Sequence, residues 1–304
     1  MRASHLIGLV VLAAIWGASF MFVKVMVHEM SPVAVAWLRL AGGAAIVGVV
    51  AVIRRSRVSL EPRFWFDLSV FAAFSSAIPF VLIPLAQQFI PANLAAILNS
   101  STPLWTSLFA FVLLPLERLS RVRVAGLVLG FVGVAMVIGP EALGMAGSGV
   151  LGELFMLGAS CCYGIAAVYF RRTLIGGDTV FMAAAQNVVA FAMMTPVVLA
   201  TNSVPHFAAL SAAAVWSSLG LGVLCSGFAM IIYYWLLQNV TATQASAVTY
   251  LVPVSAVFWS LTVLGEHLDP RIIPGLLLVA FGVYLINRRP RVQPARTAVA
   301  VSEV

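Results

Sequence analysis

Charged residues are scarce in this chain: they make up 9% of its 304 residues, whereas 62% are hydrophobic. A water-soluble domain carries about 25% charged residues, because its surface must be hydrated. The deficit therefore excludes an ordinary soluble protein and predicts that most of the surface faces lipid. The mean hydropathy of +1.07 points the same way.

Cysteine is also rare, and the three cysteines lie within apolar stretches, at Cys161, Cys162 and Cys225. They form no disulfide framework and no metal-ligand spacing, so neither a metal nor another cofactor is expected. The net charge of +7 comes from short basic clusters between apolar runs. No groove-reading motif accompanies these clusters, so lipid head groups are expected as partners and nucleic acid is not.

Ten apolar runs are long enough to cross a membrane, which takes about 20 residues of helix. We therefore predict an all-α integral membrane protein with ten transmembrane helices. The predicted spans are 6–27, 32–53, 65–87, 93–114, 124–139, 151–171, 180–200, 213–237, 243–264 and 272–287.

Lysine and arginine predict the orientation of these spans. Fourteen of them fall on the side that holds both termini, and only Lys24 and Arg271 fall on the other side. Because basic residues concentrate in cytoplasmic loops, both termini are expected in the cytoplasm. The expected location is the bacterial inner (plasma) membrane. The polar tail, 289–304, is expected to be disordered.

The two halves of the chain resemble each other. Segment 91–103 reads PANLAAILNSSTP and segment 241–253 reads TATQASAVTYLVP, so that alanines and the final prolines match at an offset of 150 residues. This predicts two repeats, 6–139 and 150–288. Because each repeat contains five helices, an odd number, the second copy must be inverted. Inverted repeats of this kind place a binding site between the halves and favour transport.

The residues that carry this pattern resemble EamA-type members of the drug/metabolite transporter superfamily, over about residues 6–287. The resemblance implies two inverted five-helix repeats around a central cavity that opens alternately to either face. It also implies export of amino acids or other small metabolites. The matching motifs are Trp16-Gly-Ala-Ser-Phe, Trp37-Leu-Arg39, Ser101-Thr-Pro103, Glu117-Arg-Leu, Tyr250-Leu-Val-Pro253 and Gly265-Glu266.

Arg39 is the first candidate for the binding site, since it lies about 10 Å into its helix and a cation inside a membrane is costly. It would clamp a substrate carboxylate through two hydrogen bonds. Two structural alternatives remain open: the side chain snorkels to the interface, or it pairs with Glu29.

Pro103 and Pro253 are a matched pair that frees a carbonyl in the preceding turn, which predicts a hinge or cavity wall; plain packing kinks are the alternative. Asn99 and Thr249 lie one turn earlier in each copy. Their side chains must hydrogen-bond to a neighbouring helix, to water or to substrate.

Further candidates for the cavity are aromatic or amide side chains. Any one of them also suits simple packing. Glu117 and Glu266 end apolar helices and are expected to cap the helix that follows. The remaining cavity candidates are Trp16, Tyr163, Gln186 and Tyr250.

Acidic residues are missing from the middle third of every predicted span. Proton-driven carriers use such groups, so antiport of drugs by that mechanism is disfavoured. No nucleophile–base pair indicates an enzyme. We predict a secondary transporter that exports neutral or zwitterionic metabolites; the alternative is efflux of drugs or apolar cations, or lipid flipping. Closely spaced glycines permit a homodimer.

Overall fold

The structure is a computed structural model that describes residues 3–56, 61–113, 121–139, 148–174, 178–239 and 248–287. Every regular element in these ranges is helical; η1 and η4 are π-helical, and η3 and η5 are 3₁₀ turns. The elements are α1 (Ala3–Met26), α2 (Pro32–Ile53), α3 (Pro62–Ala72), η1 (Ala73–Ala77), α4 (Ile78–Gln87), α5 (Ala92–Asn99), α6 (Thr102–Leu113), α7 (Arg121–Ile138), α8 (Ser148–Thr173), α9 (Thr179–Ala200), η3 (Phe207–Ala209), α10 (Ala212–Leu219), η4 (Gly220–Phe228), α11 (Ala229–Asn239), α13 (Val248–Val263), η5 (Pro270–Ile272) and α14 (Ile273–Asn287).

Nine helical stretches within the described ranges are long and apolar enough to cross a membrane. Some combine several elements: α3, η1 and α4 form one stretch, and α5 and α6 form another. The predicted span 243–264 corresponds to α13, and its first five residues lie outside the described ranges, as does the predicted tail 289–304. The prediction of an all-helical membrane fold is confirmed.

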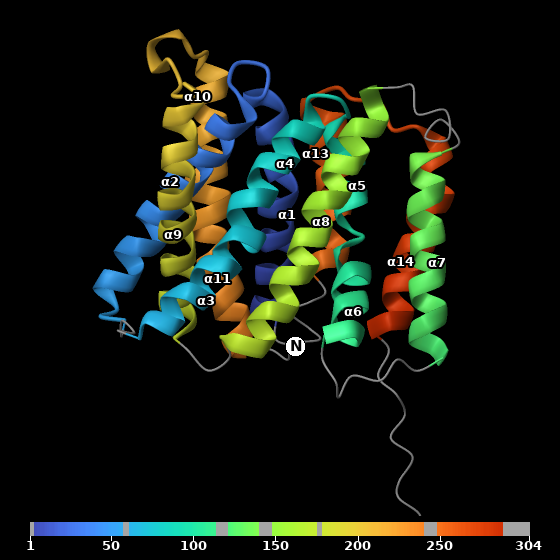
Figure 1. The fold of residues 1–304 in the computed structure, drawn as a ribbon. Helices are drawn as coiled ribbons and strands as arrows, with labels where there is room; N and C mark the ends of the chain where they lie inside the picture. Colours follow the sequence, from blue (N-terminus) through green and yellow to red (C-terminus); the bar gives the residue numbers. More distant parts are fainter. Residues whose placement is uncertain are drawn as a thin grey trace, which may run out of the picture.

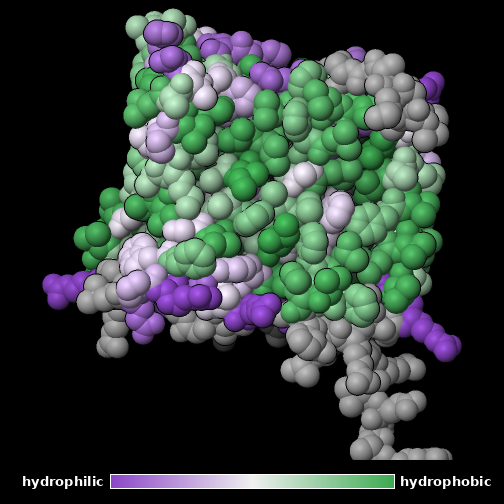
Figure 2. Space-filling model, in the orientation of Figure 1, coloured by the Kyte–Doolittle hydropathy of each residue, from purple (hydrophilic) through white to green (hydrophobic). Residues whose placement is uncertain are grey.

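The outer surface is suited to lipid. Large apolar side chains such as Ile53 and Trp216 are exposed, at 75% and 71%. Figure 2 shows a hydrophobic band across the middle of the molecule with hydrophilic residues gathered toward its two ends. The N-terminus and the end of α14 lie at the same end of the bundle (Figure 1).

Close contacts between helices reveal the inverted repeat. A Cβ atom on Gly17 of α1 would lie 2.7 Å from the backbone nitrogen of Ala256 in α13. In the other half, a Cβ atom on Gly164 of α8 would lie 2.9 Å from the backbone nitrogen of Thr106 in α6. The first helix of each repeat thus packs against the fourth helix of the other, and only glycine permits this approach.

The fifth helices, α7 and α14, pack against each other at one edge of the bundle (Figure 1). A Cβ atom on Gly126 would lie 2.8 Å from the carbonyl oxygen of Gly282, and one on Gly133 would lie 2.7 Å from that of Gly275. These glycine faces are therefore used within the chain. A homodimer stays a prediction and would need another surface.

Candidate substrate-binding site

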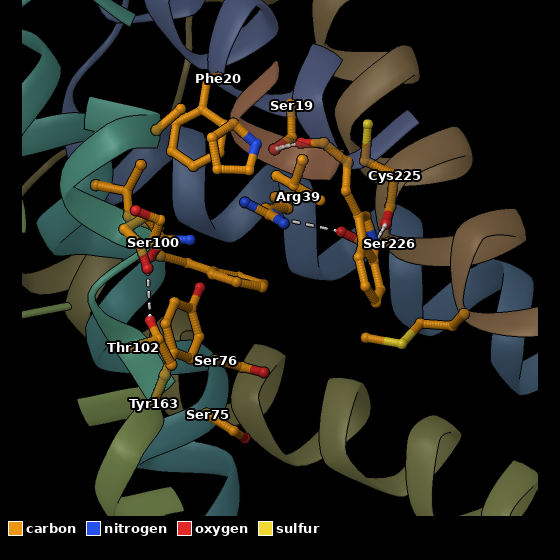
Figure 3. A pocket seen from close by; sticks show the side chains of 18 of the residues that line it. Ser19, Phe20, Arg39, Ser75, Ser76, Ser100, Thr102, Tyr163, Cys225 and Ser226 are labelled. Carbon is orange, nitrogen blue, oxygen red and sulfur yellow. Dashed lines mark hydrogen bonds between the residues drawn. The ribbon is translucent and has the colours of Figure 1, made fainter. Parts of the chain in front are cut away.

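A cavity of about 310 Å³ lies between the two repeats, near the lower limit of ligand pockets, which run from about 300 to 1,000 Å³. The first four helices of each repeat contribute to its wall, whereas α7 and α14 do not. Figure 3 shows the side chains that converge there. The lining residues are Trp16, Ser19, Phe20, Arg39, Ser75, Ser76, Phe80, Ile83, Ala96, Asn99, Ser100, Thr102, Pro103, Tyr163, Gln186, Asn187, Cys225, Ser226, Met230, Val252 and Pro253.

Arg39 enters the cavity from α2. Its Nε donates a hydrogen bond to Ser226 Oγ at 3.1 Å, and its Cζ lies 3.7 Å from the centre of the Phe80 ring. None of the described residues that line the cavity is acidic, and no carboxylate in the described ranges forms an ion pair with Arg39. The cavity therefore holds the guanidinium cation of Arg39, and no described residue supplies a carboxylate as its counter-ion.

The alternative that Arg39 pairs with Glu29 is wrong. The Glu29 carboxylate instead accepts hydrogen bonds from the backbone N–H of Ser211, at 2.8 Å, and from the Ser211 hydroxyl. These bonds, the hydroxyl's first, hold the pKa of the Glu29 carboxyl below its ordinary value. Glu29 thus secures the start of α10 outside the bundle, and Arg39 remains in the cavity.

Gln186 lies on α9 and is 8% exposed. Its Nε2 donates hydrogen bonds to Ser75 Oγ at 3.0 Å and to Ser76 Oγ at 2.8 Å. These serines belong to the π-helical segment η1, and the Ser226 partner of Arg39 belongs to the π-helical segment η4. Such segments are rare and occur often at functional sites.

Trp16 and Tyr163, at an offset of 147 residues, both line the cavity. Trp16 is held in place because its Nε1 donates to the carbonyl oxygen of Cys225 at 3.2 Å and its ring packs 5.3 Å from that of Tyr233. The two predicted aromatic candidates therefore form part of a largely apolar wall, and their contact with a substrate stays a prediction.

The fourth span is interrupted immediately before Pro103, between α5 and α6. The hydroxyls of Ser100, Ser101 and Thr102 each donate to the carbonyl three residues earlier, at 2.5, 2.7 and 2.8 Å. Carbonyls freed by the break are thus satisfied locally, as a membrane interior requires. Pro253 differs, because it lies inside the continuous helix α13.

The matched polar candidates are Asn99 in the first repeat and Thr249 in the second. Asn99 lines the cavity, and its Oδ1 lies 3.5 Å from the Ser160 hydroxyl of α8. That distance is long for a hydrogen bond, so the amide remains available to a ligand. Thr249 and Tyr250 begin α13, and their side chains lie outside the described part of the structure.

Sequence reasoning missed the serines that form hydrogen bonds with Arg39 and Gln186 in the cavity. Ser75 and Ser76 are followed 150 residues later by Cys225 and Ser226, the same offset that relates the matched prolines. All four residues line the cavity. The repeat offset was the signal that could have found them, since serine in an apolar span is otherwise unremarkable.

One end of the bundle is tied together by Glu266, which follows α13. Its carboxylate accepts from the backbone N–H groups of Ala92 and Asn93, at 2.9 and 3.3 Å, and from the Ser260 hydroxyl at 2.5 Å. The expectation that Glu266 caps the following helix is therefore wrong: it caps α5, in the other repeat. Glu117 lies outside the described residues.

Lys24 supports the same end of the bundle. Its Nζ donates to the carbonyl oxygens of Gln87 at 2.6 Å and Ile90 at 3.0 Å, where α4 ends. A cation at a helix C-terminus stabilises the free carbonyls. Together, Lys24 and Glu266 join α1, α4 and α5 of the first repeat to the loop after α13 of the second.

The EamA-like transporter family matches residues 4–139 and 150–288. "Uncharacterized transporter YoaV" of Bacillus subtilis is 26% identical over 280 residues, which cover 92% of this chain and 95% of that protein. "Protein PagO" of Salmonella typhimurium is 21% identical, over 89% of this chain and 88% of its own length.

A solved crystal structure matches with a TM-score of 0.62, over 94% of this chain and 98% of that one, at 17% identity, and therefore shows the fold alone. Membrane-length helices around a cavity lined by both halves define a multi-pass membrane protein of the carrier class. The chain belongs to the EamA-like transporter family, of the drug/metabolite transporter superfamily. The predicted family is confirmed.

Proposed function

We propose that this transporter exports amino acids or related neutral or zwitterionic metabolites across the bacterial inner membrane. The observation that carries the proposal is the guanidinium of Arg39, which lines the cavity without a carboxylate partner in the described ranges. Guanidinium groups bind carboxylates through two parallel hydrogen bonds. A substrate carboxylate would supply the missing counter-ion.

The rest of the cavity supports a substrate with one charged end and an apolar body. Phe20, Ile83 and Val252 line the wall together with hydroxyl and amide groups. Apolar cations, the alternative cargo, would meet the positive charge of Arg39 in a medium of low dielectric constant, where like charges repel strongly.

The inverted repeat supports the proposal of alternating access, because two halves of opposite orientation can exchange conformations around a fixed site. The tie between Glu266 and α5 belongs to one end of the bundle, and we expect it to break when the cavity opens at this end. We place this end outside the cytoplasm and both termini inside, because most of the basic loop residues lie at the end that holds the termini.

The test is a profile of metabolites released by a bacterial host that overproduces the protein. Wild type should release one or more amino acids above the vector level, and Arg39→Gln should abolish that release. Arg54→Gln is the matched control, because Arg54 ends the same helix and is exposed. Vector-like profiles for inserted wild type, or release of apolar cations that survives Arg39→Gln, would contradict the proposal.

A further inference from the structure

Arg39 and Gln186 occupy equivalent positions in the two repeats, 147 residues apart, and each bonds to a serine of the opposite repeat. Arg39 of α2 bonds to Ser226 of η4, whereas Gln186 of α9 bonds to Ser76 of η1. The two serines are themselves equivalent, at an offset of 150 residues. The two contacts are therefore copies of one arrangement, related by the internal symmetry of the fold.

The two copies differ in charge. One repeat presents a guanidinium, which only donates hydrogen bonds, and the other presents a neutral amide. Because both serine bonds of Gln186 use Nε2, its Oε1 is left as an acceptor. No described residue donates to this oxygen, and Gln186 lines the same cavity as Arg39. Figure 3 shows Ser226 apart from Ser75 and Ser76, so the two polar groups are anchored at different parts of the wall.

We infer that Gln186 is a second specificity-determining residue of this carrier: the substrate carboxylate binds Arg39, and the substrate ammonium group donates to Gln186 Oε1. The inference rests on the proposed function and narrows its substrate class to amino-acid zwitterions. The two repeats would thus place different groups at equivalent positions, a guanidinium and a neutral amide, and each group would bind one end of an asymmetric substrate.

A zwitterion satisfies both groups, whereas a simple carboxylic acid leaves the amide oxygen of Gln186 without a donor. Leaving a desolvated polar group unpaired weakens binding by about 10- to 100-fold. An amine without a carboxylate leaves Arg39 unpaired and adds charge repulsion, so it should bind more weakly still.

The test measures the dissociation constants of leucine, isocaproate and isoamylamine for the detergent-purified protein by titration calorimetry. These probes share one apolar body and differ only in their polar ends. Wild type should bind leucine at least about 10-fold more tightly than isocaproate, and isoamylamine most weakly. Gln186→Met should lose the preference for leucine while its affinity for isocaproate is unchanged. Gln88→Met is the matched control, because Gln88 is an exposed amide at the end of α4.

A variant with exchanged residues, Arg39→Gln/Gln186→Arg, guards against simple misfolding. The internal symmetry predicts that it recovers a preference for leucine that Arg39→Gln alone lacks. Equal binding of leucine and isocaproate by wild type, or equal weakening of both by Gln186→Met, would overturn the inference and leave the proposed function standing. Preference for isoamylamine, or no binding of any probe, would overturn both.

Discussion

Replacing Glu266 should shift the conformational balance of the carrier. Its carboxylate is one link between the second repeat and the start of α5, through the backbone N–H groups of Ala92 and Asn93. A further hydrogen bond, which Asn93 Nδ2 donates to the carbonyl oxygen of His267 at 3.3 Å, remains when the carboxylate is removed. We expect the carboxylate contact to break when the cavity opens at that end. The Glu266→Ala variant loses the link and should therefore spend more time open there.

The magnitude follows from the bonds that are lost. Removal of a helix N-cap costs about 0.5–2 kcal/mol, and hydrogen bonds to a charged group contribute about 1.5–3 kcal/mol. Since Glu266 is half-buried, we take about 2 kcal/mol, a value within both ranges, which changes the ratio of the two conformations about 30-fold.

The assay uses a single reactive cysteine in the cavity, Ser100→Cys, in a chain whose native cysteines are replaced by serine. The rate of labelling by a membrane-impermeant maleimide is measured in vesicles of both orientations. From the side that Glu266 faces, labelling should accelerate by at least about 10-fold, and from the opposite side it should slow.

Asp269→Ala is the matched control for this experiment. Asp269 lies in the same loop, but its carboxylate accepts from the backbone N–H of Arg271 and caps η5 within its own repeat. Its loss should leave both labelling rates unchanged. Identical rates for the Glu266→Ala variant and this control would refute the view that Glu266 holds the two repeats together.

Three further predictions concern the helix contacts. Gly17→Val should lower the thermal midpoint in detergent, because the new side chain meets the backbone of α13, at a cost of about 1–3 kcal/mol, whereas Gly48→Val, with nothing within 4 Å, should be neutral. Hydrogen bonds from Ser211 lower the pKa of the Glu29 carboxyl. The stability that Glu29 adds is therefore complete above the ordinary carboxyl pKa and is lost as the pH falls through the lowered pKa. The difference in thermal midpoint between wild type and Glu29→Gln should be constant near neutral pH and shrink below about pH 4. Lys24→Met removes the cation from the end of α4. The last backbone amides of α4 should then exchange faster with deuterium, while exchange rates in α9 stay the same.

Much of the fold was accessible to sequence reasoning, because membrane helices obey simple rules. Span length follows from bilayer thickness, and apolar composition follows from contact with lipid. The largest local differences arise where helices are irregular: the fourth span breaks between α5 and α6, although its hydropathy is continuous. The break depends on hydroxyl–carbonyl bonds that hydropathy cannot register.

The candidate site was predictable to the extent that intramembrane polar residues are few. Arg39, Asn99 and Gln186 stand out in apolar helices, and the structure places all three around one cavity. Their roles toward a substrate stay predictions. Ser76 and Ser226 did not stand out, because serine is a common small residue in membrane helices.

The sequence by itself determined that this protein lies in a membrane, that it is all-helical, and that it consists of two inverted copies. These properties depend on composition and on residue spacing along the chain. Only the tertiary structure decided which residue meets which across the two copies: Glu266 with α5, Arg39 with Ser226, Gln186 with Ser76. These contacts join residues 110 to 187 positions apart, and they follow from how the helices pack, which no local pattern in either helix specifies.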